Sequence, residues 1–373
     1  MPFVDLAEQQ RRIRSDLDLR IAKVLDHGGY ILGPEVAELE AALAALASCR
    51  HAITVSSGTD ALLALLMAKG IGPGDGVFLP SFTFTATAEV VLQCGATPVF
   101  VEVDPQTFNM DPDHLGEMIA ETKRQGDLRP AAVIPVDLFG QPADYQSISK
   151  LAGDNELFVL GDAAQSFGAS YHNRAVGSLV EATATSFYPA KPLGCYGDGG
   201  AIFTDDDELA AICVSLRAHG QGEGRYDIVR LGLNARMDTM QAAVLLSKLT
   251  IFEDEIQRRR YVAAHYNKRL AGLVETPVQM PGAASIWAQY TIKLPHRDAV
   301  AAQLREQGIP TQIYYPLPMH LQPAYAPYGQ GVGSLPVSEQ LCQEVLALPM
   351  HPYLDEATID RICDALVEAQ QSI

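Results

Sequence analysis

Short apolar strands alternate with helical segments through the first two-thirds of the chain. Strands are expected at 52–55, 77–80, 98–103, 131–136, 157–160, 182–187 and 201–204, and helices at 35–47, 61–69 and 87–94. Strands that are separated by helices predict an α/β fold with a mostly parallel sheet covered on both faces. Because ligands of such sheets bind at the carboxyl ends of the strands, polar residues directly after a strand are the first candidates for a functional site.

The pattern changes after about residue 245. One long charged helix is expected at 246–270, and strands at 289–294 and 308–314 flank a helix at 298–307, with a last helix at 355–370. A chain of 373 residues, 48% of them hydrophobic, is long enough for one large domain and a smaller one. We therefore predict a large domain over 1–245 and a smaller α+β domain over 246–373.

The segment 185–200 carries one lysine, Lys191, shortly after an expected strand. Ser186 lies just upstream of it and a glycine-rich turn lies just downstream. A lysine that forms a Schiff base needs a fixed position, an anchor for the phosphate of its cofactor and room for a flat ring. The alternative is a lysine in an ordinary surface turn, which needs none of these features.

Asp162 and Gln165 follow the apolar strand expected at 157–160. A carboxylate at the end of such a strand is costly to bury without a partner. Together with Lys191 it indicates a pyridoxal 5′-phosphate site, with Lys191 on the aldehyde carbon and Asp162 on the pyridinium nitrogen. Gln165 would donate to the phenolic oxygen of the cofactor. The alternatives are a helix N-cap for Asp162 and an exposed helical position for Gln165.

The motif Ser57-Gly58-Thr59 lies between the strand at 52–55 and the helix at 61–69. Free backbone N–H groups and the positive end of the helix dipole make such a junction a seat for phosphate. Glycine at position 58 lets the backbone approach the ligand closely. An ordinary helix N-cap is the alternative, but Ser186 as a second phosphate ligand favours the phosphate interpretation.

An aromatic side chain is expected to stack on the cofactor ring and hold its plane. Two phenylalanines in the segment 80–87, Phe82 and Phe84, compete for this role. We favour Phe84 and expect Phe82 to serve only in core packing.

The cluster 232–238, GLNARMD, holds another pair of polar candidates. Arg236 can bind a carboxylate in bidentate fashion, and Asn234 can reach a phosphate. From these residues alone the cluster is an ordinary helix entry, because Asp238 precedes a helical run through 241–246.

Net charge and cysteine usage exclude several functions. The net charge of −18 argues against general binding to nucleic acid or to anionic membranes. The 6 cysteines form no Cys-x-x-Cys pair, so reduced thiols are expected. No apolar run approaches the roughly 20 residues of a membrane span, and the N-terminus lacks a charged and then apolar leader. We therefore expect a cytoplasmic enzyme without a metal site.

These motifs together resemble the DegT/StrS-type family of sugar aminotransferases over essentially the whole chain. The matching segments are 5–6, 30–36, 57–61, 82–87, 162–165, the Lys191 loop and 234–236. The resemblance implies the aspartate aminotransferase-like fold (fold type I). It also implies that Lys191 holds the cofactor and shuttles the proton during transamination. Members with histidine at the position of Lys191 dehydrate instead, and this chain has the lysine.

The resemblance extends to the ligands of the site. The implied cofactor ligands are Gly58, Thr59, Phe84, Asp162, Gln165, Ser186 and Asn234. Asn234 matches the residue that the partner subunit lends to the phosphate, which implies a homodimer with a shared active site. Arg236 matches a position that meets the substrate carboxylate in enzymes acting on uronates.

Within the family, the sequence is most similar to enzymes that aminate C3 of a keto sugar. The implied reaction transfers the amino group of glutamate to UDP-2-acetamido-2-deoxy-3-oxo-glucuronate, for bacterial surface polysaccharide such as lipopolysaccharide. Tyr314 and Tyr315 are the other implied substrate ligands, although Tyr314 stands where relatives often have histidine. Gly161 stands where many members have an acid, and strand alternation points it away from Asp162.

Two other functions remain open at this point. One is a C3 or C4 aminotransferase for a dTDP-linked 6-deoxy keto sugar, which lacks the C6 carboxylate. The other is a non-catalytic sensor or regulator that keeps the fold as a binding module.

Overall fold

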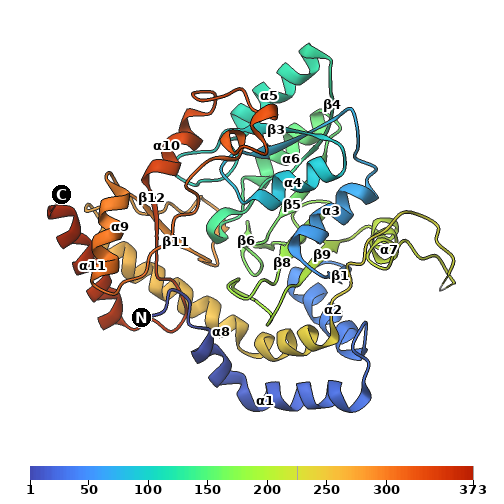
Figure 1. Ribbon diagram of the computed structural model, residues 1–373, viewed down its shortest axis with the longest axis horizontal. Coiled ribbons are helices and arrows are strands. Elements are labelled where there is room, and N and C mark those ends of the chain that lie inside the picture. The colour runs from blue at the N-terminus through green and yellow to red at the C-terminus, as the bar shows by residue number, and fades with distance from the viewer. Residues whose placement is uncertain (225, 373) are drawn as a thin grey trace.

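The computed structural model describes residues 1–224 and 226–372. Within them, a seven-stranded sheet forms the centre of the larger domain, in the order β1-β9-β8-β5-β4-β2-β3 (Figure 1). The strands are β1 (His51–Val55), β2 (Asp75–Pro80), β3 (Thr97–Val101), β4 (Arg129–Val133), β5 (Phe158–Asp162), β8 (Ala182–Ser186) and β9 (Gly200–Thr204). All neighbouring strands are parallel except β9, which is antiparallel to β1 and β8. The expected mostly parallel α/β sheet is therefore confirmed.

Helices cover both faces of this sheet. They are α2 (Pro34–Ala47), α3 (Gly58–Ala68), α4 (Thr85–Gln93), α5 (Pro112–Gln125), α6 (Tyr145–Asp154), α7 (Asp207–Leu216) and the first half of α8 (Thr239–Leu270), while α1 (Leu6–His27) packs on α8. Residues of one strand alternate between the two cores. Val77 and Leu79 pack in the cluster that contains α3 and α4, whereas Phe78 packs in the cluster that contains α5 and α6. This two-sided burial explains why the strands are continuous apolar runs.

The carboxyl ends of β1, β2, β5 and β8 meet at one edge of the sheet. β2, β4, β5 and β8 are parallel, and β1 points the same way because β9 is antiparallel to both β8 and β1. β9 brings its amino end to the same edge, where Gly200 pairs with Val55 and with Ser186. Every motif that follows one of these strands therefore opens onto the same side.

A second core lies at the C-terminal side. It contains the end of α8 and the elements β11 (Tyr290–Lys293), α9 (Arg297–Glu306), β12 (Val345–Leu348) and α11 (Glu356–Gln371). α8 spans both cores, because Phe252 packs with the sheet domain and Tyr266 packs with the C-terminal cluster. The expected boundary at 245/246 falls inside this helix, and α1 runs along it (Figure 1).

The strand expected at 308–314 is wrong. Gln312 forms only an isolated bridge to Ala347, and the partner of β11 is β12. Pro310 lacks an N–H group and cannot contribute it to a ladder, which limits strand formation in this segment.

The chain then returns to the larger domain before it ends. Two short 3₁₀ turns, η2 (Met319–Leu321) and η3 (Ala326–Tyr328), precede α10 (Pro336–Glu344). Met319, Tyr325 and Leu335 pack in the core that contains α3 and α4. Small strands β6 (Ser170–Tyr171), β7 (Arg174–Ala175) and β10 (Ala283–Ala284) form a separate sheet, and η1 (Leu138–Gly140) follows β4. None of the helices in the described ranges has the length and apolar composition that a bilayer span requires.

Candidate active site

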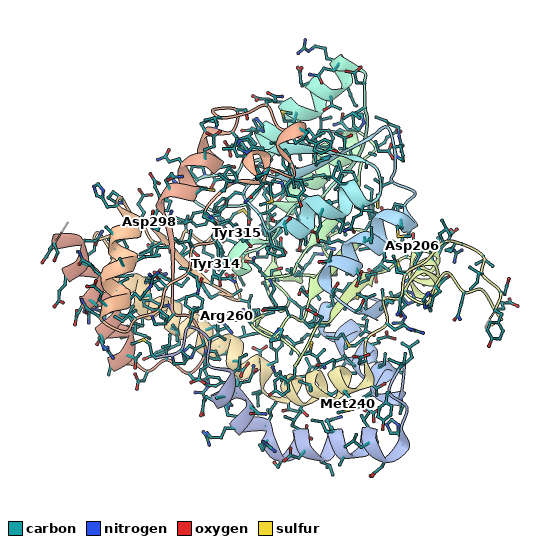
Figure 2. All side chains as sticks on the ribbon, in the orientation of Figure 1. Asp206, Met240, Arg260, Asp298, Tyr314 and Tyr315 are labelled. Carbon is teal, nitrogen blue, oxygen red and sulfur yellow. The ribbon has the colours of Figure 1, made fainter. Side chains whose placement is uncertain are left out.

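One cavity of about 520 Å³ opens at the edge where the strands end. Most of the site residues expected from the sequence line it: Gly58, Thr59, Phe84, Asp162, Gln165, Ser186, Lys191, Tyr314 and Tyr315. Figure 2 shows Tyr314 and Tyr315 close together near the centre of the molecule, where the C-terminal part of the chain meets the sheet domain. Residues that are far apart in the sequence are thus brought into one site by the topology of the sheet.

Lys191 lies on the tight loop that joins β8 to β9. Its backbone N–H donates to the carbonyl of Tyr188 at 2.8 Å, which closes a turn around the lysine. A side chain at Gly194 would lie 2.5 Å from the carbonyl oxygen of Pro189, so the loop folds back only with glycine there. Burial lowers the pKa of Lys191, and the nearby charge of Asp162 opposes this shift. The surface-turn alternative is therefore excluded, because the amine points into a buried site.

Asp162 ends β5 and is only 5% exposed. Its carboxylate accepts hydrogen bonds from the hydroxyl of Thr87 at 2.9 Å and from the backbone N–H of Ala164 at 3.1 Å. Burial raises the pKa of Asp162, and these two donors and Lys191 act in the opposite direction. A turn rather than a helix follows Asp162, so the N-cap alternative is wrong.

Gln165 is 6% exposed, so its alternative as an exposed helical residue is also wrong. Its side-chain oxygen accepts from the backbone N–H of Phe139 at 2.7 Å. Its side-chain nitrogen donates to the hydroxyl of Tyr315 at 3.3 Å. These two contacts fix which end of the amide faces the cavity, and that end is the donor.

A cradle lies at the start of α3. Ser57 is the N-cap, and its hydroxyl accepts from the backbone N–H of Asp60 at 3.0 Å. The N-cap alternative is thus true of Ser57, and it coexists with the cradle. A side chain at Gly58 would lie 2.7 Å from Cβ of Ser186, and a side chain at Gly200 would lie 2.4 Å from the carbonyl oxygen of Ser57. The two glycines therefore hold Ser186 and the start of the helix close together, in a geometry suited to an anion.

The two competing phenylalanines differ clearly in position. Phe84 lines the cavity and is 56% exposed, whereas Phe82 is 1% exposed and packs on Phe108 and Phe139. Phe84 lies 6.3 Å from Tyr315 between ring centroids. Of the two, only Phe84 is placed so that a flat ring in the cavity can contact it.

Asn234 and Arg236 do not line the cavity of their own chain. Asn234 is exposed, and its side-chain oxygen accepts from Arg236 at 2.6 Å. Nε of Arg236 is buried without a hydrogen-bond partner. The intervening residue, Ala235, accepts from the N–H of Ser56 at 3.0 Å, which places this segment against the outer side of the cradle.

Sequence reasoning missed several polar groups near the site. Among them, Thr87 binds Asp162, and Gln289 and Asp198 line the cavity. Asp137 is another, since it is fully buried and its N–H donates to the carbonyl of Asp162 at 3.0 Å. Asp137 follows an apolar run, as Asp162 does, so the same signal was available for it. Thr87 and Gln289 gave no sequence signal, because only the fold brings them to the cavity.

A sequence profile of the DegT/DnrJ/EryC1/StrS aminotransferase family matches residues 11–367. The chain belongs to this family. A relative from Pseudomonas aeruginosa, UDP-2-acetamido-2-deoxy-3-oxo-D-glucuronate aminotransferase, is 48% identical over 98% of this chain and 99% of its own length. A second relative, dTDP-3-amino-3,4,6-trideoxy-alpha-D-glucose transaminase from Streptomyces venezuelae, is 41% identical over 99% and 96% of the two chains.

A solved structure agrees with this assignment. The crystal structure of a DegT DnrJ EryC1 StrS aminotransferase from Brucella abortus has a TM-score of 0.96 and 52% identity, and covers 98% of each chain. The family and the fold type I architecture that the motifs indicated are therefore confirmed. The chain is a sugar aminotransferase that uses pyridoxal 5′-phosphate.

The residues present fit this cofactor. The glycine-bounded cradle suits a phosphate, the buried carboxylate of Asp162 suits a protonated ring nitrogen, and the amine of Lys191 faces the same cavity. Apart from Lys191, the described residues lining the cavity include no lysine, arginine or histidine. A second anionic group in this site therefore needs positive charge from elsewhere.

Proposed function

We propose that this aminotransferase moves the amino group of glutamate to C3 of UDP-2-acetamido-2-deoxy-3-oxo-glucuronate. The observation that carries the chemistry is the meeting of Lys191, Asp162 and the cradle of Gly58 and Ser186 in one cavity. The relative from Pseudomonas aeruginosa, at 48% identity, supports the choice of substrate. We place the reaction in the cytoplasm, in the synthesis of a surface polysaccharide such as lipopolysaccharide.

Each residue has a distinct task in this mechanism. The bound cofactor supplies an electron sink for the carbon that loses or gains a proton. Lys191 would hold the cofactor through its amine, and the same amine would hold and return the proton during the transfer. Burial lowers the pKa of Lys191, a direction that suits a group that has to give up and take back a proton.

Asp162 and its neighbours fix the orientation of the ring. The carboxylate of Asp162 keeps the ring nitrogen protonated, and Thr87 and Ala164 hold the carboxylate in place. Gln165 and Phe84 line the cavity, where Gln165 would donate to the phenolic oxygen and Phe84 would stack on the ring. The backbone of Gly58 and Thr59, together with the hydroxyl of Ser186, binds the phosphate.

A homodimer with shared active sites accounts for the residues that lie outside the cavity. Asn234 and Arg236 sit on a segment with strongly exposed apolar side chains, including Leu231, which is 88% exposed. We infer that the partner subunit's Asn234 binds the cofactor phosphate and the partner subunit's Arg236 binds the substrate carboxylate. The lack of a further cation among the described lining residues supports this arrangement.

The second candidate is amination at C3 or C4 of a dTDP-linked 6-deoxy keto sugar. The relative from Streptomyces venezuelae favours it, and so does Tyr314, which brings a neutral aromatic ring to the cavity rather than a basic group. The non-catalytic sensor is not supported, because the lysine and the carboxylate of the reaction are both present and correctly buried.

An absorption spectrum with pyridoxal phosphate, before and after glutamate, tests the cofactor site and the amino donor. We expect the band of the lysine-bound cofactor to convert to that of the pyridoxamine form. A coupled assay that compares the UDP-linked uronate with a dTDP-linked 6-deoxy keto sugar then identifies the substrate. Faster turnover of the dTDP sugar would support the second candidate.

Subunit complementation tests the shared site. Lys191→Ala and Asn234→Ala subunits, each weakly active alone, are denatured together, refolded and assayed. If Asn234 acts in the partner's site, mixed dimers contain one site in which both residues are intact, and activity reappears. A mixture no more active than its two components would contradict the shared site.

A further inference from the structure

Two buried side chains, Ser81 and His320, and the half-buried Glu339 form a hydrogen-bonded chain outside the cavity. Ser81 Oγ lies 2.7 Å from Nδ1 of His320, and Nε2 of His320 lies 3.2 Å from Oε1 of Glu339. They come from the end of β2, from η2 and from the first turn of α10. The Ser81–His320–Glu339 chain therefore joins segments that are more than 200 residues apart in sequence.

The hydrogen bonds around His320 select one tautomer. Oγ of Ser81 accepts from the backbone N–H of His320 at 3.2 Å, so its own hydrogen is available to Nδ1. Nε2 then carries the ring proton and donates to Glu339. Glu339 is held in turn by the backbone N–H of Gly333 at 2.7 Å. With this tautomer every polar atom of the chain is satisfied, as expected for buried groups that hold a fixed geometry.

The order serine, histidine, carboxylate is also that of an activated nucleophile. This role does not fit Ser81, which is 0% exposed and does not line the cavity. A substrate therefore cannot reach its hydroxyl. The Ser81–His320–Glu339 chain instead holds the segments that it connects in a fixed position.

The Ser81–His320–Glu339 chain connects the two segments that carry Phe84 and Tyr315, two aromatic residues of the cavity. Ser81 precedes Phe84 by three residues, and its carbonyl accepts from the N–H of Met319 at 2.8 Å. His320 follows Tyr315 by five residues, and two of the intervening residues are prolines, which restrict the backbone. A shift at His320 would therefore move both Phe84 and Tyr315, and with Tyr315 the amide of Gln165.

We propose that the Ser81–His320–Glu339 chain positions Phe84 and Tyr315 and so fixes the plane in which the site holds the cofactor ring. Ser81, His320 and Glu339 are positioning residues, because none of them lines the cavity. This inference rests on the proposed function, since it assumes that the cofactor occupies the cavity beside Lys191.

Ser81→Ala, compared with Ser338→Ala, separates positioning from stability. Ser338 is equally buried and donates to Glu102 from the next position of α10, so its loss is a matched control. Both variants should have a lower Tm. Only Ser81→Ala should weaken the visible circular dichroism of the bound cofactor and lower kcat/KM, on the order of tenfold, as expected for a small displacement of a reacting group.

His320 allows a finer comparison. The side-chain oxygen of asparagine can replace Nδ1 as the acceptor from Ser81, whereas glutamine can replace Nε2 as the donor to Glu339. Because Ser81 is the side of the chain nearer to Phe84, His320→Asn should retain more of the cofactor signal than His320→Gln. If His320→Gln proves the better substitute, the proposed route through Ser81 is wrong.

The outcomes distinguish this inference from the proposed function. If Ser81→Ala and Ser338→Ala lose equal stability and both keep the wild-type cofactor signal and kcat/KM, the chain is purely structural. If the wild type gives no band with pyridoxal phosphate, or if Lys191→Ala keeps that band, the assignment of the cavity fails first. If His320 variants do not fold, the pair Ser81→Ala and Ser338→Ala still decides the question.

Discussion

Expected ligands lie in two regions that differ in burial. One is the floor of the cavity, formed by Lys191 and Asp162, and the other is the segment between α7 and α8. On the floor, Asp162 is 5% exposed and each of its carboxylate oxygens has a donor within the chain. On the other segment, whose described parts are 217–224 and 226–238, Leu231 is 88% exposed. Asn234, near its end, lies outside the cavity.

This difference separates the residues that meet in one cavity of the chain from those that lie outside it. Burial lowers the pKa of Lys191 and raises the pKa of Asp162, and shifts of this kind are characteristic of functional sites. The exposed segment bears polar groups and apolar surface together, which is characteristic of a contact with another protein surface. Variants in the two regions should therefore fail in different ways.

The largest effect is expected on the floor, from Lys191→Ala. It removes both the anchor and the proton carrier, so turnover should fall by at least about a thousandfold. The measurement is the rate of transamination with glutamate. Appreciable residual turnover would count against the mechanism, and a spectrum of the variant with pyridoxal phosphate serves as the control for the missing covalent link.

Asp162→Ala should lower both cofactor affinity and rate. A hydrogen bond to a charged group contributes about 1.5–3 kcal/mol, which corresponds to roughly 10- to 150-fold in the Kd of the cofactor. Equilibrium titration with pyridoxal phosphate measures the affinity. If the variant kept both affinity and rate, Asp162 would not be part of the cofactor site.

Arg236→Ala should leave Lys191 and Asp162 intact and act mainly on the substrate, although it also removes the hydrogen bond to Asn234. We expect KM for the uronate to rise about tenfold through loss of a charge-assisted contact, with the cofactor spectrum unchanged. Arg236→Lys keeps the charge but not the bidentate geometry and should recover part of the loss. An unchanged KM in the alanine variant would indicate a neutral sugar. It would also mean that the segment carrying Arg236 has no role in binding the substrate.

The smallest expected effect is on the pH dependence of stability, and it comes from Asp137, which is buried next to Asp162. Burial raises the pKa of Asp137 to about 7, well above its value in an unfolded chain. The folded state therefore binds more protons between pH 4 and 7, and stability falls as the pH rises through that range, by at most about 1.4 kcal/mol per pH unit.

Asp137→Asn should remove this part of the pH dependence. Measured from pH 5 to 8, the Tm of the wild type should fall relative to that of Asp137→Asn. Parallel curves for the two proteins would show that Asp137 does not titrate in this range. The comparison uses the protein without added cofactor, so that binding does not contribute.

The sequence predicted the sheet domain well because its signals are local. Apolar runs marked the strands, and the polar residues after them marked Lys191, Asp162, Gln165 and Ser186. It failed for 308–314, where apolar residues suggested a strand but Pro310 limits strand formation. It predicted α8 in two parts, a helical run through 241–246 and a helix over 246–270, whereas the structure has one continuous helix that begins at Thr239.

By itself, the sequence determined the family and the cofactor through its motifs, and it predicted most of the residues that line the cavity, because strand ends and glycine-bounded turns constrain the backbone locally. Only the tertiary structure decided between Phe82 and Phe84, turned Gln165 inward and brought Thr87 to Asp162. It alone also placed Asn234 and Arg236 outside the cavity and linked Ser81 to His320. These outcomes depend on contacts between segments far apart in the chain, and no local pattern of residues encodes which segments will meet.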